Sequence, residues 1–160
     1  MLQDVFCENL ADLESSRDWT KPLSLVFSTT TNPYWRSNTE KKRSMTGKSG
    51  SGTLVMDGNA ETALVLVTAT AETKLTAIQL KAGNTMLKLT GINVPAGKKL
   101  TVDYKDNRYL RILANGTSVI SKLDKTSSDN LLAECGKSNS VSFTADAKST
   151  VEFSARGCWL

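Results

Sequence analysis

Apolar residues recur at every second position over most of this sequence, and that spacing limits the folds open to the chain. The pattern is clear in residues 23–27, 100–104, 141–143 and 151–155, where Leu, Val, Phe and Tyr alternate with polar side chains. Successive side chains of a strand point to opposite faces of a sheet. The spacing therefore predicts strands with one buried and one solvated face.

One turn is encoded strongly enough to predict its pairing. The Asn-Gly pair at 115–116 lies between two apolar stretches, and it tolerates the positive φ that a two-residue type I′ hairpin requires. Such a turn fixes the register of its strands. Ile112 is expected to face Val119, and Leu110 to face Ser121.

The remaining pattern indicates an all-β protein. The continuous apolar run 63–67 predicts a central strand covered on both faces. Nine or ten strands separated by turns, without alternating helices, favour an antiparallel β-sandwich or jelly roll.

Three segments depart from the strand pattern. Residues 4–17 carry apolar side chains at helical spacing behind Asp4, which predicts a short N-terminal helix. We therefore divide the chain into a helical segment, 1–20, and a β domain, 21–160. A helical turn capped by Ser127 or Ser128 is expected over 128–134, and a mobile loop over the Gly-, Ser- and Lys-rich residues 41–52.

Composition narrows the chemistry. The chain has no histidine, so Ser-His-Asp and Cys-His catalysis are excluded within it. Cys7, Cys135 and Cys158 are an odd, scattered set that predicts reduced thiols rather than a disulfide framework or zinc site. A thiol nucleophile would need a neighbouring base or an electropositive setting. We expect no cofactor, no metal and no catalytic residue.

Targeting signals are also missing from the pattern. No apolar run approaches the length of a membrane span, and the first residues lack the basic and apolar regions of a secretory signal peptide. We expect synthesis in the cytoplasm and no membrane insertion.

The net charge of +4 is unevenly distributed. Residues 1–20 hold five acidic side chains against Arg17, while residues 36–48 hold five basic side chains against Glu40. One short basic stretch without interleaved aromatics is typical of a solvated loop. Phosphate binding there is the alternative, and no nucleic-acid partner is expected.

Local motifs suggest little further chemistry. Gly47-Lys48-Ser49 lacks the leading glycine of a phosphate loop. Asp103 and Asp106 could hold a cation, although a solvated strand end is the favoured interpretation. The glycosylation pattern at 115–117 coincides with the hairpin. A pair of carboxylates for glycoside hydrolysis could come from different strands, but nothing in the sequence singles one out.

Three aromatic residues are the best candidates for a functional surface. Tyr34 and Trp35 follow Asn32-Pro33, and Trp159 is the penultimate residue. Large aromatics cover core edges, anchor protein interfaces and stack on sugar rings. All three interpretations remain open for Tyr34, Trp35 and Trp159.

Several short motifs, in order, resemble the C-terminal part of bacteriophage distal tail proteins. The family carries a strand ending in Pro-Tyr, a Gly-Asn turn before a buried strand, and a leucine-rich strand followed by Asp-Tyr. Similar motifs lie here at residues 25–27, 32–35, 57–62, 87–91, 95–97, 100–104, 127–132, 136, 139–143 and 156–159. The last motif of the family usually reads Arg-Gly-Arg-Trp, whereas residues 156–159 of this chain read Arg-Gly-Cys-Trp.

The resemblance implies a structural role. Distal tail proteins form a hexameric ring between the tail tube and the host-recognition apparatus, with an N-terminal belt domain and a galectin-like C-terminal β-sandwich. Residues 1–20 would correspond to the end of the belt, so ring formation by this chain stays open. We expect a non-catalytic tail-tip scaffold in the virion that binds tail tube, tail-tip and receptor-binding proteins. A carbohydrate-binding module for host glycans is the alternative, and a glycan hydrolase is the third hypothesis.

Overall fold

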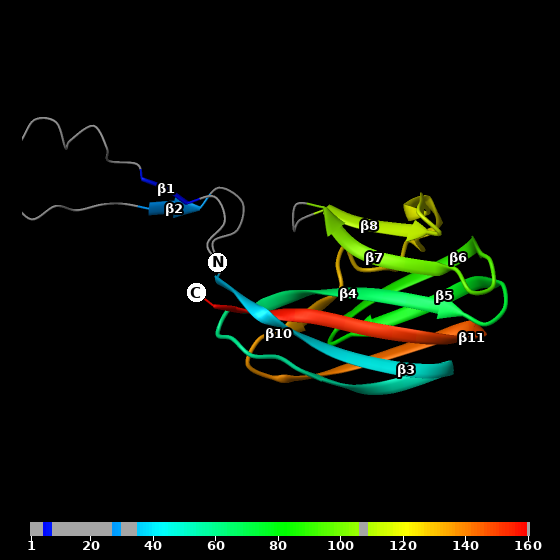
Figure 1. Ribbon diagram of the computed structural model, residues 1–160, viewed down its shortest axis with the longest axis horizontal. Helices are drawn as coiled ribbons and strands as arrows, with labels where there is room; N and C mark the ends of the chain where they lie inside the picture. Colours follow the sequence, from blue (N-terminus) through cyan, green and yellow to red (C-terminus); the bar gives the residue numbers. More distant parts are fainter. Residues whose placement is uncertain (1–4, 8–26, 30–34, 106–108, 160) are drawn as a thin grey trace, which may run out of the picture.

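Eleven strands and one short 3₁₀ turn account for the regular structure of the residues described (Figure 1). The computed structural model describes the backbone of residues 5–7 and 27–29 and all atoms of residues 35–105 and 109–159. The elements are β1 (Val5–Cys7), β2 (Phe27–Thr29), β3 (Trp35–Val55), β4 (Thr62–Ala71), β5 (Leu75–Ala82), β6 (Thr85–Val94), β7 (Lys99–Lys105), β8 (Tyr109–Ala114), β9 (Thr117–Ser118), η2 (Ile120–Lys122), β10 (Leu132–Glu134) and β11 (Ser138–Trp159).

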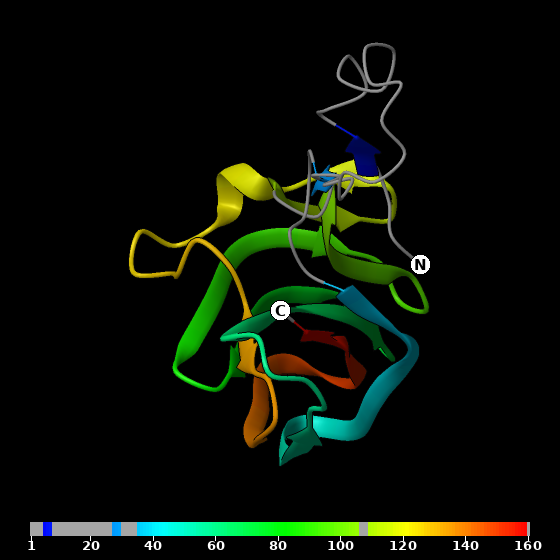
Figure 2. The same ribbon diagram turned by 90° about the vertical axis from the view of Figure 1, so that its left-hand side faces the viewer.

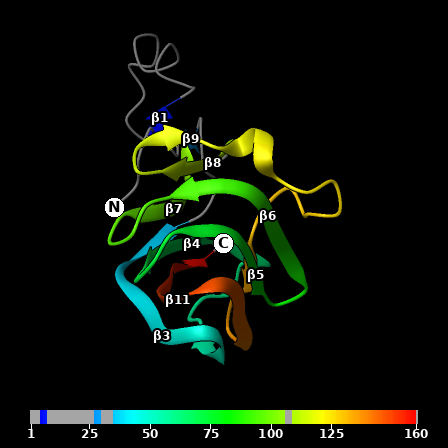
Figure 3. The ribbon, with the colours of Figure 1, turned by 90° about the vertical axis from the view of Figure 1, so that its right-hand side faces the viewer.

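Nine of these strands form one antiparallel sheet that curls on itself (Figures 2 and 3). Its order is β6-β5-β11-β4-β7-β8-β9, with β3 added along β11 and β10 along β4. The 22-residue β11 organises this sheet, because its first half pairs with β5 and its second half with β4. Along its other side it pairs with the 21-residue β3. The strands β1 and β2 form a separate two-stranded ribbon.

The sheet bends at a corner that three segments share. The pairing of β11 with β3 shifts between Thr144 and Ser149, and β4 ends near the same place, just before β5 begins. Asp146 fastens this corner, since its carboxylate accepts hydrogen bonds from Thr76 N–H at 3.1 Å and from the Thr76 hydroxyl at 2.5 Å. Bulges of this kind bend a sheet strongly enough to bring its halves together.

Buried apolar side chains line the inside of the curl. They come from strands of both halves and are almost wholly inaccessible, including Val65, Leu80, Leu87, Val102, Ile112, Phe143 and Phe153. The predicted alternation is confirmed in β7 and β11, where Leu100, Val102, Val141, Phe143, Val151, Phe153 and Ala155 are buried. The expected strand at 23–27 lies outside the described residues except for Phe27, which begins β2.

The apolar run 63–67 forms part of β4, a strand with neighbours on both edges. The prediction that both of its faces are covered is wrong. Ala63, Val65 and Val67 are buried, whereas Leu66 is 36% exposed on the opposite face. The run therefore follows the two-faced rule after all, with a leucine on its open side.

The hairpin at 115–116 is confirmed. Asn115 and Gly116 both have positive φ, 47° and 84°, as a type I′ turn requires. Val119 N–H donates to Ile112 O at 2.9 Å, in the predicted register. The further pairing of Leu110 with Ser121 is wrong, because β9 ends at Ser118 and η2 begins at Ile120. Leu110 instead faces Tyr104 across the β7–β8 ladder.

The two helical predictions do not hold where they are described. Val5–Cys7 form a strand paired with Phe27–Thr29, and the rest of the expected helix 4–17 lies outside the described residues. Residues 128–134 lead into β10 instead of a helical turn. The Ser127 and Ser128 hydroxyls do not cap a helix, because they accept hydrogen bonds from the N–H groups of Lys88 and Met86 on β6.

The predicted mobile loop 41–52 is a strand. These residues form the middle of β3 and pair with β11 from Lys41 opposite Ala155 to Gly52 opposite Val141. Their glycines make room for neighbouring side chains: a Cβ on Gly50 would lie 2.7 Å from the Phe143 ring, and one on Gly52 would lie 2.6 Å from Arg43 Nε. The composition that indicated a loop thus serves close packing along a bent strand.

Candidate interaction surface

Two of the three aromatic candidates meet at the start of β3 and the end of β11. Trp35 and Trp159 are direct cross-strand partners in the antiparallel ladder. Trp35 is 51% exposed, whereas Trp159 is half-buried. Tyr34 lies outside the described residues. The structure therefore places one solvent-exposed indole beside a partly covered one at this end of the sheet.

Residues 57–60 support this end from the other side of β11. Asn59 N–H and Ala60 N–H both donate to Cys158 O at 3.1 Å. A Cβ on Gly58 would lie 2.1 Å from Cys158 O, and one on Gly157 would lie 2.4 Å from Asp57 O. Backbone meets backbone here, so both positions require glycine.

A thiol occupies the position before Trp159. Cys158 is 3% exposed and lies close to Cys135 and Arg36. Burial raises the pKa of the Cys158 thiol, and Cys135 adds to this while Arg36 opposes it. Because the thiolate is the reactive form of cysteine, a buried thiol with a raised pKa is a poor nucleophile.

The predicted basic stretch lies along β3. Lys41 pairs with Asp57 at 2.8 Å, and Lys42 pairs with Glu152 at 3.1 Å. The hydrogen bond to Glu152, followed by that to Glu40, raises the pKa of Lys42. Exposed pairs of this kind contribute little to stability, so their main effect is to offset part of the positive charge of this surface.

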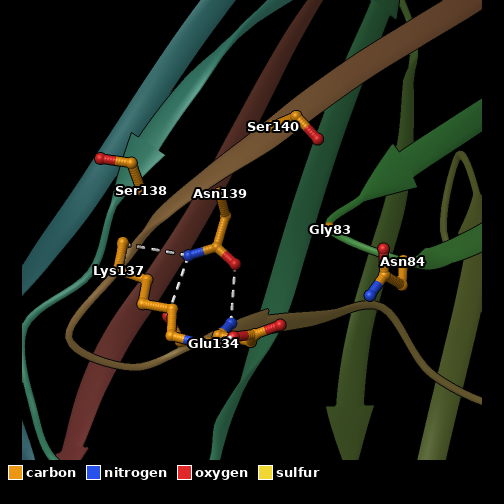
Figure 4. Close-up of a pocket in the computed structure, with 7 residues that line it drawn as sticks. All are labelled: Gly83, Asn84, Glu134, Lys137, Ser138, Asn139 and Ser140. Carbon is orange, nitrogen blue, oxygen red and sulfur yellow. Dashed lines mark hydrogen bonds and ion pairs between the residues drawn. The ribbon is translucent and has the colours of Figure 1, made fainter.

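A small polar hollow lies between the β5–β6 turn and the β10–β11 turn (Figure 4). Asn139 crosses it: its amide oxygen accepts from Glu134 N–H at 2.7 Å, and its amide nitrogen donates to Glu134 O and Lys137 O. At about 210 Å³ the hollow is smaller than the usual ligand pocket and has a polar lining. The Asn139 side chain at its centre closes the turn between β10 and β11 through these hydrogen bonds.

The other motifs noted in the sequence lie in positions that a structural role explains. Gly47-Lys48-Ser49 lies at the corner of β3, in a strand instead of a phosphate loop. Asp103 accepts two hydrogen bonds from Arg111, at 2.6 and 2.7 Å, and Asp106 lies outside the described residues. Among the residues the structure covers, no group of three or more Cys, Asp or Glu side chains is arranged to hold a metal ion.

Sequence reasoning missed one feature: the outer edge of β3 pairs with no strand in the described part of the chain. Lysine is a common residue on exposed edge strands, where its charge discourages unwanted pairing. The basic residues of 36–48 were therefore a usable signal, but the glycines and serines among them favoured a loop.

No protein-family model matches the chain, and no curated protein matches its sequence. In the part of the chain that the structure describes, no helix has both the length and the apolar character needed to cross a bilayer.

Proposed function

We propose that this protein is a non-catalytic structural component of a bacteriophage tail tip that binds other tail proteins through its surface. The proposal rests on the ordered motifs that resemble distal tail proteins and on the all-β architecture. It places the protein in the virion tail after synthesis in the host cytoplasm. Its partners would be tail tube, tail-tip and receptor-binding proteins.

The proposal also includes the type of all-β fold. A galectin-like β-sandwich or jelly roll would require two facing sheets, and the corner shared by β3, β11 and the β4–β5 connection supports such an arrangement. By the same resemblance, residues 1–20 would correspond to the end of a belt domain. A hexameric ring belongs to the full family member.

One observation carries the interaction role: Trp35 is a large aromatic side chain, 51% exposed, paired across the ladder with Trp159 at the end of β11, which close backbone contacts with residues 57–60 hold in place. Tryptophan is enriched among the residues that dominate protein interfaces, and a rigid position lowers the entropy lost on binding.

The direct test is to mix the purified chain with tail-tip proteins encoded beside it and to measure complex formation by analytical ultracentrifugation. Trp35→Ala should weaken binding by at least about tenfold. Tyr109→Ala is the matched control, because Tyr109 is also an exposed aromatic, at 65%, but lies on β8. Failure of the unmodified chain to bind any tail protein or to co-sediment with particles would contradict the proposal.

Carbohydrate binding is the second candidate, and the same exposed indole favours it. Aromatic faces stack on sugar rings, and Trp35 remains accessible while its partner Trp159 is half-buried. Calorimetric titration with host surface glycans would detect binding that disappears in Trp35→Ala. Binding that persists in this variant would remove the indole from the site.

A further inference from the structure

The edges of the curled sheet differ in how far other segments of the chain cover them. Residues 123–128 cover the edge of β6, where Asp124 N–H donates to Lys88 O at 2.8 Å and Ser128 N–H donates to Met86 O at 2.7 Å. At the opposite end of the order, β9 has only two residues. The outer edge of β3 pairs with no strand among the described residues, although β3 is 21 residues long.

The hydrogen-bonding pattern shows which groups of β3 lie along that edge. Glu72 N–H donates to Lys148 O at 2.9 Å. Because antiparallel partners bond at every second residue, the even residues of β11 beyond 148 bond to β4 and the odd residues bond to β3. Their partners on β3 are Lys41, Arg43, Met45 and Gly47. The N–H and C=O groups of Lys42, Ser44 and Thr46 therefore point to the open edge.

The charge of this edge defines the strand that fits it. Residues 36–48 carry five basic side chains and one acidic side chain. Lys41 and Lys42 pair with Asp57 and Glu152. Arg43 and Lys48 form no ion pair with the residues that the structure describes, so they leave a net positive charge along this edge. A second β3 would bring two like-charged stretches side by side, which destabilises cross-strand pairing. A strand with the opposite charge is favoured.

The chain itself contains such a segment. Residues 1–20 carry five acidic side chains and one basic side chain, and Val5–Cys7 within them already form a strand. Among the strands that the structure describes, β1 pairs only with β2, in a two-stranded ribbon separate from the sheet. Such a ribbon is marginally stable alone in water, so little free energy opposes its exchange for a long strand edge.

We propose that the acidic N-terminal segment of a second copy, through β1, adds to the open edge of β3 and links copies of this chain head to tail. Main-chain hydrogen bonds to Lys42, Ser44 and Thr46 would supply affinity, and the opposite charges would supply selectivity. Because the two surfaces differ, the contact is heterologous and generates rings or filaments. This inference goes beyond binding to other tail proteins and does not depend on Trp35.

The test follows the oligomeric state of the full chain in reductant by light scattering, over a concentration series at low and high salt. We expect association that weakens as salt screens the charges. Ser44→Pro should weaken it at least about tenfold, because proline removes the outward N–H while the ladder to β11 is retained. Ser44→Ala keeps that N–H and should associate like the unmodified chain.

Two further variants test whether the acidic N-terminal segment is the strand that binds this edge. The chain in which Asp4, Glu8, Asp12, Glu14 and Asp18 are changed to Asn or Gln should become monomeric, as should Lys42→Glu/Lys48→Glu. Circular dichroism shows whether Ser44→Pro folds. If it does not, Lys42→Glu/Lys48→Glu still tests the contribution of the β3 edge. Association that survives the N-terminal neutralisation would assign the edge to a different strand and overturn the proposal.

Two other outcomes would also overturn it. One is an unmodified chain that stays monomeric at every concentration. The other is a monomer whose Lys42, Ser44 and Thr46 amides are protected from hydrogen exchange until the acidic residues are neutralised, because this would mean that the segment pairs within its own chain.

Discussion

Tyr104 joins the end of β7 to the segment that enters β10. Its hydroxyl accepts a hydrogen bond from Leu131 N–H at 2.8 Å and donates one to Leu131 O at 3.3 Å. Burial raises the pKa of Tyr104 to about 12, against the opposing effect of the Leu131 backbone. Leu131 is completely buried and also accepts from Val65 N–H. One phenol thus fixes a buried backbone position between two strands.

Tyr104→Phe should lower the free energy of unfolding by about 1–3 kcal/mol at pH 8, because it leaves the buried Leu131 N–H without its acceptor. The folded protein keeps the phenol protonated at a pH where the unfolded chain, with a pKa near 10, loses the proton. Stability should therefore fall as pH rises from about 10 to 12, by up to about 2–3 kcal/mol more than in Tyr104→Phe. Urea unfolding of both proteins across this range measures the difference, and equal pH slopes would contradict it.

Gly58→Ala should destabilise the end of the sheet that carries Trp35 and Trp159. The new methyl would lie 2.1 Å from Cys158 O, so one of two backbone segments must move. Gly97→Ala is the matched control, because both glycines have positive φ but a Cβ on Gly97 meets nothing within 4 Å. Gly58→Ala should cost about 1–3 kcal/mol more than the control in thermal or urea unfolding. Equal losses would mean that the contact with β11 relaxes without cost.

For single residues, the sequence showed which side chains are candidates for a functional surface, but it did not show which residues are in contact. Trp35 and Trp159 could be chosen as candidates from their chemistry, but their pairing depends on β3 and β11 coming together from opposite ends of the chain. The contact of Gly58 with Cys158 joins residues a hundred positions apart. No local pattern encodes a contact of that kind.

At the scale of elements, strands with strict alternation and the Asn-Gly hairpin were predictable because both are local. The middle of β3 was not, since its lysines, serines and glycines favour a loop when read alone. It becomes a strand because β11 offers a long partner, with Phe143 packed over Gly50. The N-terminal apolar spacing fails similarly where Val5–Cys7 pair with β2. In both places a tertiary partner overrides local propensity.

The strand at 41–52 predicts an alternating pattern of amide protection. Lys41, Arg43 and Met45 donate toward β11 and should exchange slowly, whereas Lys42, Ser44 and Thr46 face the open edge and should exchange faster by about tenfold or more. Residue-resolved hydrogen exchange by NMR on the monomer, at low concentration, gives the comparison. Uniformly fast exchange across all six residues would restore the loop interpretation.

At the scale of the molecule, the fold class was accessible from sequence and the topology was not. Two separate alternating stretches, 141–143 and 151–155, turned out to belong to one strand that bends at Ala145–Lys148 and serves both halves of the sheet. A corner of this kind depends on where β4, β5 and β3 meet β11, which hydrophobic period alone does not specify. The uneven charge of the chain, in contrast, was plain from the sequence. It becomes meaningful because β3 leaves one edge without a partner strand among the residues that the structure describes.

The separation of the β1–β2 ribbon from the sheet predicts that the two parts are energetically independent. A chain that starts at residue 33 keeps β3 to β11 and all of the buried side chains identified here, so it should unfold cooperatively with a midpoint within about 4 °C of the full chain. It should also lose self-association, because the acidic segment is gone while the open edge of β3 remains. Circular dichroism melts and light scattering on both chains test the two halves of this prediction. A truncated chain that is unfolded would show that the N-terminal residues complete the sheet, whereas a folded one that still associates would place the contact between copies elsewhere.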